Sequence, residues 1–170
     1  MQEGFRKKLL SGQAAAKNSI RMHHVFVYGT LKRGFRLHGY MEGAEFLAPA
    51  RLKDYRMHRV SWYPAIVESP GEEVFGELFR IPESLLPVLD EVEDRGTMYE
   101  RVVKEIEILE ERDFSGDGPA FAGSSFAFGD EKGREERERL QTGPRTMSAF
   151  VYVYLLPLRE EPVVEGGLFL

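Results

Sequence analysis

Short runs of β-branched and aromatic residues, separated by turns, recur along most of this 170-residue chain. The first run, at 24–28, ends at Gly29-Thr30 and is typical of a buried strand that enters a tight turn. The last run is apolar at both odd and even positions, as in a strand covered on both faces. The remaining runs predict further strands at 45–52, 64–67, 74–81, 99–109 and 147–156. The sequence therefore predicts a strand-rich domain.

One segment, Ser84–Glu93, has clear helical periodicity. Its leucines and valines form one apolar face, and Ser84 is placed to cap the first amides. Pro87 falls in the first turn, where a missing N–H costs nothing. Gly96 is suited to a left-handed stop after the helix.

Composition excludes several classes of protein. The 23 basic and 28 acidic side chains give a net charge of −5, which disfavours a nucleic-acid partner. The absence of cysteine excludes thiol nucleophiles and thiolate metal sites. No apolar run is long enough to span a bilayer, so we expect a soluble, cytoplasmic protein without a membrane partner.

Common signatures of metal and nucleotide sites are also missing. The four histidines form no H-E-x-x-H pair, and there is no G-x-S-x-G elbow. Neither G-x-x-x-x-G-K-[ST] nor G-x-G-x-x-G occurs. The sequence accordingly predicts no metal site and no cofactor.

Two segments differ in composition from the predicted domain at 23–170. Residues 1–22 contain five basic residues and one acidic residue, and predict either an amphipathic helix or an appendage before an alternative start at Met22. Residues 110–145 interrupt the strand pattern and are interpreted as an insertion. Its charged second half, 130–139, favours a solvated ion-paired helix, with a mobile loop as the alternative.

The turn after the first strand is a candidate anion site. Gly29 lets the backbone approach a ligand closely, and successive amides of such a turn can converge on a carboxylate. An ordinary turn is the alternative reading, because glycine commonly follows a strand.

A second candidate is the acidic end of the predicted helix. Asp90, Glu91, Glu93 and Asp94 lie together there, where repulsion and the helix dipole oppose ionisation. A partly desolvated carboxyl in this position would have a raised pKa suited to proton transfer. A solvated acidic helix end is the simpler alternative.

Taken together and in order, these motifs resemble the γ-glutamylcyclotransferase-like family, which includes γ-glutamylamine cyclotransferases and plant AIG2-like proteins. The resemblance spans about residues 24–109 and 147–156, and the motifs that carry it are V-F-V-Y-G-T-L-K-R-G at 25–34, His38, Tyr63-Pro64, V-F-G-E-L-F at 74–79, Leu89-Asp90-x-x-Glu93 and Tyr99-x-Arg101. It implies an α+β fold, a small mixed β-barrel flanked by short helices. Asp94 departs from the pattern, since many members have glycine there.

The resemblance also implies a function and a site. The backbone amides of the turn, carried over to Tyr28, Gly29, Thr30 and Leu31, would hold the α-carboxylate of a γ-glutamyl substrate, and Glu93 would be the general acid and base. The substrate's α-amine would attack its own γ-carbonyl, releasing 5-oxoproline and an amine or amino acid without cofactor. Tyr99 is either an oxyanion donor or a core tyrosine.

Two alternatives remain open at this stage. The same pocket could instead remove a γ-glutamyl protecting group or cleave a γ-glutamyl-ε-lysine crosslink. In a different class, the fold could serve as a non-catalytic binding or scaffold module that engages a partner through 1–22 or 110–145.

Overall fold

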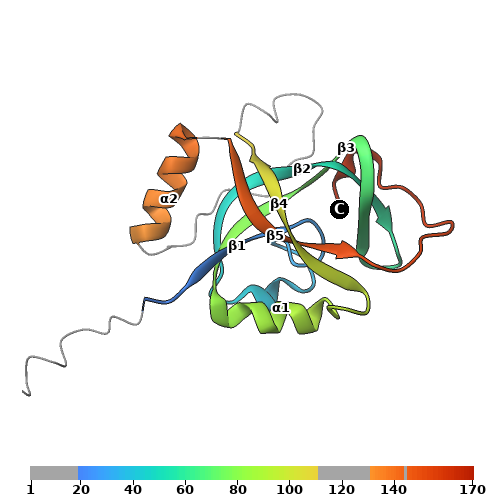
Figure 1. Ribbon diagram of the computed structural model, residues 1–170, viewed down its shortest axis with the longest axis horizontal. Coiled ribbons are helices and arrows are strands. Elements are labelled where there is room, and N and C mark those ends of the chain that lie inside the picture. Colours follow the sequence, from blue (N-terminus) through green and yellow to red (C-terminus); the bar gives the residue numbers. More distant parts are fainter. Residues whose placement is uncertain (1–18, 111–130, 144) are drawn as a thin grey trace, which may run out of the picture.

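The chain folds into a closed five-stranded β-barrel with two helices outside it (Figure 1). The computed structural model describes residues 19–110, 131–143 and 145–170. The strand order is β1-β3-β2-β4-β5, and every neighbouring pair is antiparallel except β1 and β5. The strands are β1 (Met22–Val27), β2 (Glu45–Arg59), β3 (Pro64–Pro82), β4 (Tyr99–Ile108) and β5 (Thr146–Tyr154). The predicted small mixed barrel flanked by short helices is confirmed.

Strand β3 is longer than expected. The separate strands predicted at 64–67 and 74–81 are one continuous strand that pairs with β2 along a hairpin. The polar stretch between them hid the continuity, because its side chains point to solvent and form pairs such as Arg56 with Glu72. Register shifts in β2 between Phe46 and Ala48 and between Lys53 and Tyr55 are of the kind that bends a long ribbon around a barrel.

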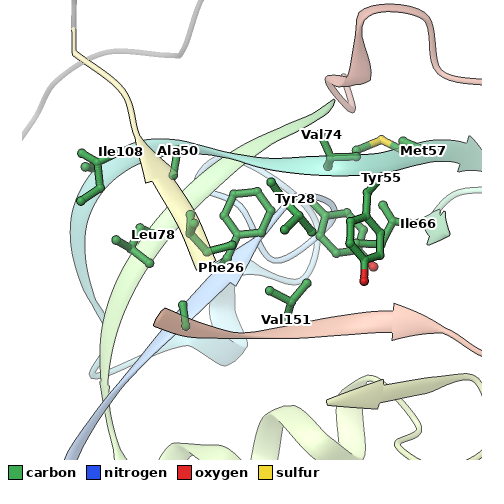
Figure 2. Close-up of a cluster of buried hydrophobic side chains, with 14 of the residues drawn as sticks. Phe26, Tyr28, Ala50, Tyr55, Met57, Ile66, Val74, Leu78, Ile108 and Val151 are labelled. Atoms are coloured by element: carbon green, nitrogen blue, oxygen red, sulfur yellow. The ribbon is translucent and has the colours of Figure 1, made fainter. Parts of the chain in front are cut away.

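Apolar side chains pack in two clusters, one inside the barrel and one beneath it. Along β1, Phe26 points into the interior cluster, which Figure 2 shows, while Val25 and Val27 belong to the outer cluster. Strand β5 divides in the same way, with Val151 inside and Tyr152 outside. This two-sided burial explains why both strands are apolar at odd and even positions.

The predicted helix at Ser84–Glu93 is shorter than expected. A 3₁₀ turn, η2 (Glu83–Leu85), precedes α1 (Leu86–Val92). The capping role predicted for Ser84 is wrong, because the N-cap is Leu85 and no side chain caps the helix, whereas Pro87 does lie in the first turn. The left-handed residue directly after the helix end is Asp94, with φ of 46°, and Gly96 lies farther on in the following turn.

Helix α2 (Glu131–Thr142) lies beside the barrel, at the left in Figure 1, whereas α1 lies beneath it. It is held there by ion pairs rather than being fully solvated. Glu136 contacts His24 at 2.6 Å and Arg80 at 3.3 Å, and Arg137 pairs with Glu45. The first half of the predicted insertion and nearly all of the predicted leader lie outside the described residues.

Candidate active site

Three hydrogen bonds that involve side chains hold the turn that follows β1. The buried Glu77 of β3 accepts a hydrogen bond from the Arg33 amide at 2.9 Å. Nδ1 of His38 lies 2.9 Å from the Leu31 carbonyl, and because a carbonyl can only accept, this nitrogen donates. Buried Lys32 donates to the Phe169 carbonyl at 2.6 Å. The backbone conformation of the turn is thus fixed by side chains behind it.

Gly29 is required by close packing within this turn. A Cβ on Gly29 would lie 2.5 Å from Cγ of Pro64, the first residue of β3. The sequence interpretation assigned this glycine to close approach of a ligand, but the nearest group is a proline ring of the protein. Among the described residues, no backbone carbonyl accepts from the amides of Gly29, Thr30 or Leu31. These three donors are therefore available to a bound anion.

Helix α1 ends against the same turn. Its C-cap residue, Glu93, lines one cavity together with the turn residues Tyr28, Gly29, Thr30 and Leu31, and with Tyr99. The cavity has a volume of about 140 Å³. Two segments more than sixty residues apart in the chain are thus brought to one pocket. The sequence expectation that these residues share a site agrees with this geometry.

The Glu93 carboxyl is in an unusual electrostatic environment. Desolvation raises its pKa to about 7, and this is the sole cause of the shift. No ion pair or hydrogen bond to the Glu93 carboxyl occurs within the described part of the chain. Of the causes that the sequence interpretation named, partial desolvation is the one that raises this pKa, and repulsion within the acidic cluster is not.

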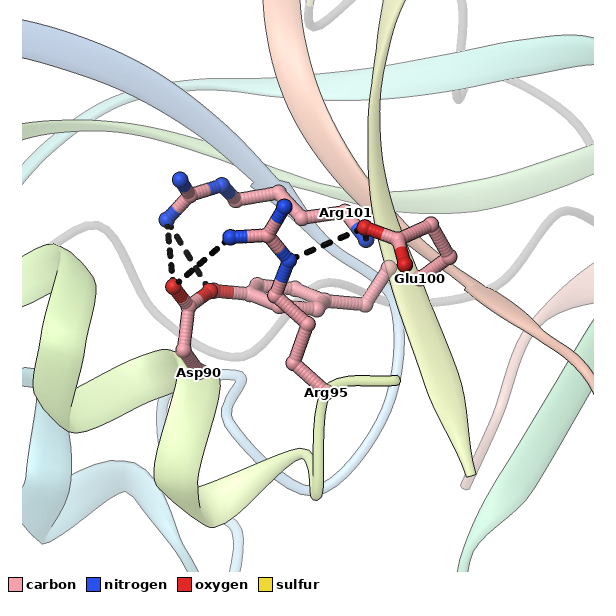
Figure 3. Close-up of polar contacts among 5 residues, drawn as sticks. Asp90, Arg95, Glu100 and Arg101 are labelled. Atoms are coloured by element: carbon pink, nitrogen blue, oxygen red, sulfur yellow. Dashed lines mark hydrogen bonds and ion pairs between the residues drawn. The ribbon is translucent and has the colours of Figure 1, made fainter. Parts of the chain in front are cut away.

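The neighbouring acids are arranged so that they do not crowd Glu93. Glu91 and Asp94 are exposed. Asp90 is neutralised by arginines: Arg101 contacts both of its carboxylate oxygens at 2.9 Å and Arg95 lies 3.2 Å away (Figure 3). The Tyr152 hydroxyl also donates to Asp90, at 2.7 Å.

Asp94 stands at the position where many members of the family have glycine. Its φ of 46° lies in the left-handed region, which glycine occupies without strain and which aspartate tolerates better than most residues. The Asp94 carbonyl accepts from the amides of Thr97 and Met98, so the turn after the helix is closed in spite of the missing glycine. The backbone at Glu93 is consequently held in place.

Tyrosines form much of the pocket wall. Tyr99 is buried and donates to the Pro64 carbonyl at 2.6 Å, and Tyr28 donates to the Tyr152 carbonyl at 2.5 Å. Burial, followed by the charge of Glu93, raises the pKa of Tyr99. Its proton is thus retained and directed at a backbone carbonyl, which favours the core interpretation of Tyr99 over the oxyanion donor.

Several pocket residues were missed by sequence reasoning. Leu37, Trp62, Val92, Met98 and Tyr152 also line the cavity. They are apolar or aromatic and carry no motif of their own. Trp62 had one available signal, since it precedes the Tyr63-Pro64 pair that forms part of the family pattern.

No helix in the described ranges is long and apolar enough to cross a membrane. No group of three or more His, Asp or Glu side chains that could hold a metal ion was found within residues 19–110, 131–143 and 145–170.

Comparison with known proteins points in one direction. A family model described as "Gamma-glutamyl cyclotransferase, AIG2-like" matches residues 25–169. The chain is 33% identical over 108 residues to the γ-glutamylaminecyclotransferase of Mus musculus, covering 57% of this chain and 70% of that protein. It is 36% identical over 80 residues to a putative γ-glutamylcyclotransferase of Vibrio cholerae, covering 46% of this chain and 69% of that protein.

The fold agrees with these sequence matches. The crystal structure of an AIG2-like protein from Mus musculus superimposes with a TM-score of 0.56 at 24% identity, covering 88% of this chain and 95% of that one. An uncharacterised protein from Pyrococcus horikoshii gives a TM-score of 0.55 at 20% identity, with coverages of 86% and 88%. The family match spans most of the chain and includes both the turn and the acidic helix end, and this protein therefore belongs to the γ-glutamyl cyclotransferase, AIG2-like family of enzymes.

Proposed function

We propose that this enzyme cleaves a γ-glutamyl amide by cyclising its glutamyl group, releasing 5-oxoproline and an amine or amino acid. The observation that carries the proposal is the pairing, in one cavity, of free turn amides with a desolvated, unpaired carboxyl. The amides suit an anionic anchor, and the carboxyl suits a proton carrier. A γ-glutamyl group offers an α-carboxylate and an adjacent α-ammonium, which match these two features.

In the proposed complex the α-carboxylate binds the amides of Gly29, Thr30 and Leu31. This anchor folds the substrate so that its α-nitrogen approaches its own γ-carbonyl carbon. Correct orientation of two groups within one molecule can supply roughly 7–11 kcal/mol of the barrier. The pocket therefore needs no nucleophile of its own.

Glu93 is the proposed proton carrier. The α-ammonium must lose a proton before its nitrogen can attack and a second one as the ring closes, and the departing nitrogen gains two protons on leaving as an ammonium. A carboxyl with a pKa of about 7 can accept and return protons near neutral pH, because neither its acid nor its base form is strongly favoured. The C–N bond formed in the ring replaces the C–N bond that breaks, and no water is consumed.

The proposal is tested by incubating the protein with γ-glutamyl amines, γ-glutamyl dipeptides and glutathione. The expected result is equimolar release of 5-oxoproline and of the corresponding amine or amino acid from at least one compound. Release of free glutamate would instead indicate hydrolysis by water. A complete lack of turnover by folded protein would favour the alternative of a non-catalytic module.

The role of the turn is tested with a matched pair of glycine variants. Gly29→Ala places a methyl group against Pro64 and displaces the turn, so we expect KM to rise by at least tenfold, in line with a lost anchor. Gly39→Ala is the control, because a Cβ there meets nothing within 4 Å. Equal kinetics in the two variants would contradict an anchoring role for the turn.

A further inference from the structure

The cavity is too small to enclose a whole γ-glutamyl compound. Its volume of about 140 Å³ is similar to that of an engineered cavity of about 150 Å³ that binds benzene. A glutamyl group is larger than benzene and already occupies this space. On the proposed function, on which this inference rests, the leaving group must therefore lie at the mouth of the pocket.

Trp62 stands at that mouth. It lines the cavity and is also 47% exposed to solvent. It belongs to the tight loop that joins β2 to β3, closed by a hydrogen bond from the Val60 amide to the Tyr63 carbonyl at 2.9 Å. The Tyr63 ring packs edge-on against the indole at 5.2 Å. The indole is thus a fixed aromatic surface beside the opening.

Arg36 lies across one face of this indole. Its guanidinium is 4.5 Å from the centre of the Trp62 ring, within the range of a cation–π contact. The next residue, Leu37, lines the cavity, and its amide donates to the Thr30 carbonyl at 2.9 Å. The loop that carries Arg36 is therefore tied to the proposed carboxylate anchor.

The charge of Arg36 is not neutralised by the protein. Within the described ranges, Arg36 forms a contact with Trp62 and no ion pair with a carboxylate. Among the described residues, Glu93 at the proposed reaction centre is the one charged side chain that lines the cavity. A leaving group at the mouth consequently meets an aromatic face and an unpaired positive charge.

We propose that Arg36 and Trp62 form the leaving-group subsite of this enzyme, and that they favour γ-glutamyl compounds whose leaving group is an amino acid bearing a carboxylate. The carboxylate is attracted to the guanidinium, while the aliphatic part of the amino acid lies against the indole. A leaving group with a second cationic amine and no carboxylate meets repulsion at the same position. Arg36 is thus a specificity residue, and it takes no part in proton transfer.

The test uses two substrates that differ by one carboxylate, γ-glutamylalanine and γ-glutamylethylamide. Their leaving amines differ in basicity, so the measured quantity is the change in the ratio of their kcat/KM values between variants. We expect Arg36→Gln to lower the ratio of alanine to ethylamide about fivefold, the scale of an exposed ion pair. Arg36→Lys should retain most of the preference, and Arg36→Glu should lower the ratio further than Arg36→Gln does, because its carboxylate repels that of the leaving group.

The dependence of the kcat/KM ratio on ionic strength provides a second test of the Arg36 contact. Because the contact is exposed, the wild-type ratio should fall as ionic strength rises, and the ratio of Arg36→Gln should not. Arg56→Gln is the control, since Arg56 is an arginine of β2 whose partner, Glu72, does not line the cavity, whereas the partner of Arg36, Trp62, does. It should behave as the wild type.

The two proposals fail in different ways. If the wild type turns over neither substrate nor any other γ-glutamyl compound, the proposed function fails. If it cleaves the ethylamide while Arg36→Gln and Arg36→Glu keep the wild-type ratio at low salt, the subsite is wrong and the function stands. Circular dichroism of each variant establishes that a changed ratio comes from folded protein.

Discussion

Two carboxylates three residues apart on one short helix have opposite environments. Asp90 is surrounded by partners, with both oxygens on Arg101, a further contact from Arg95 and a hydroxyl from Tyr152 (Figure 3). Glu93 has no such partner, and desolvation raises its pKa to about 7. The acidic cluster is therefore divided by environment: the Asp90 carboxyl fastens α1 to the barrel, and the Glu93 carboxyl, the proposed proton carrier, is unpaired.

The largest expected effect is the loss of rate when Glu93 is replaced. Glu93→Gln keeps the shape of the side chain and removes its ability to carry a proton, so we expect kcat to fall by about 10²–10⁴ with the fold intact. The measurement is 5-oxoproline release from the best substrate of the wild type. Glu91→Gln is the matched control, being a solvent-exposed acid of the same helix. Full activity in Glu93→Gln would remove the basis for the distinction between the two carboxyls.

The pH dependence of the rate tests whether the rate follows the raised pKa of Glu93. As a general base Glu93 must be ionised, so kcat/KM should rise with pH, with a midpoint near 7. About two pH units below the midpoint the rate should be about a hundredfold lower. A midpoint near 4.5 would mean that the carboxyl is solvated and that the proposed proton carrier is a different group.

The raised pKa of Glu93 predicts that ionisation of this carboxyl lowers the free energy of unfolding. Folded protein holds the Glu93 proton up to a pH of about 7, whereas the unfolded chain releases it near 4.5, so between these values the folded state binds more protons. The free energy of unfolding of the wild type therefore falls as pH rises through this window and stays lower above it.

Glu93→Gln removes the loss of stability that ionisation of Glu93 causes. At pH 8 we expect the variant to be more stable than the wild type by up to about 3 kcal/mol, and at pH 4 the difference should vanish. Urea denaturation at both values measures it. A variant that is less stable than the wild type at pH 8 would show that the ionised carboxylate is stabilised by a contact.

A smaller effect, on the free energy of unfolding, is expected when Asp90 is replaced. Asp90→Asn leaves the mostly buried guanidinium of Arg101 without its counter-charge, and we expect a loss of about 1–3 kcal/mol in the free energy of unfolding. The midpoint of the pH–rate profile should stay near 7, because Asp90 does not line the cavity. A shifted midpoint would show that the two carboxyls are coupled.

The smallest effect is expected at Arg95. This side chain is 40% exposed and contacts both Asp90 and Glu100 at the surface. Solvent and salt weaken such pairs, and Asp90 retains Arg101 when Arg95 is changed. Arg95→Gln should leave the thermal midpoint and the rate close to those of the wild type. A loss as large as that of Asp90→Asn would show that the cluster acts as one unit.

Much of the strand pattern was predictable because burial on two faces is visible in local sequence. The apolar runs that became β1 and β5 are examples. The joining of 64–67 to 74–81 was not predictable, since the solvent-facing residues between them resemble a loop until β2 pairs with them. Ser84 likewise had the right type and place for a cap, yet the 3₁₀ turn η2 moves the helix start past it.

The residues that line the candidate pocket were partly predictable from the sequence, whereas their electrostatic environments were not. The family pattern pointed to Glu93 and to the turn at 28–31, and these residues do line one cavity. Apart from that pattern, nothing in the acidic run separates Asp90 from Glu93, because the sequence contains no measure of solvation. Trp62 and Arg36 come from different loops, and their contact exists only in the folded chain.

By itself, the order of residues determined which segments form strands, where a glycine turn interrupts them and that acids gather at one helix end. These depend on interactions between residues close together in the chain. Tertiary structure decided which acid is neutralised by arginines and which is desolvated, because both outcomes depend on groups brought from β4, β5 and the turn. Closure of the barrel places those groups, and the chemistry of the pocket follows from that placement.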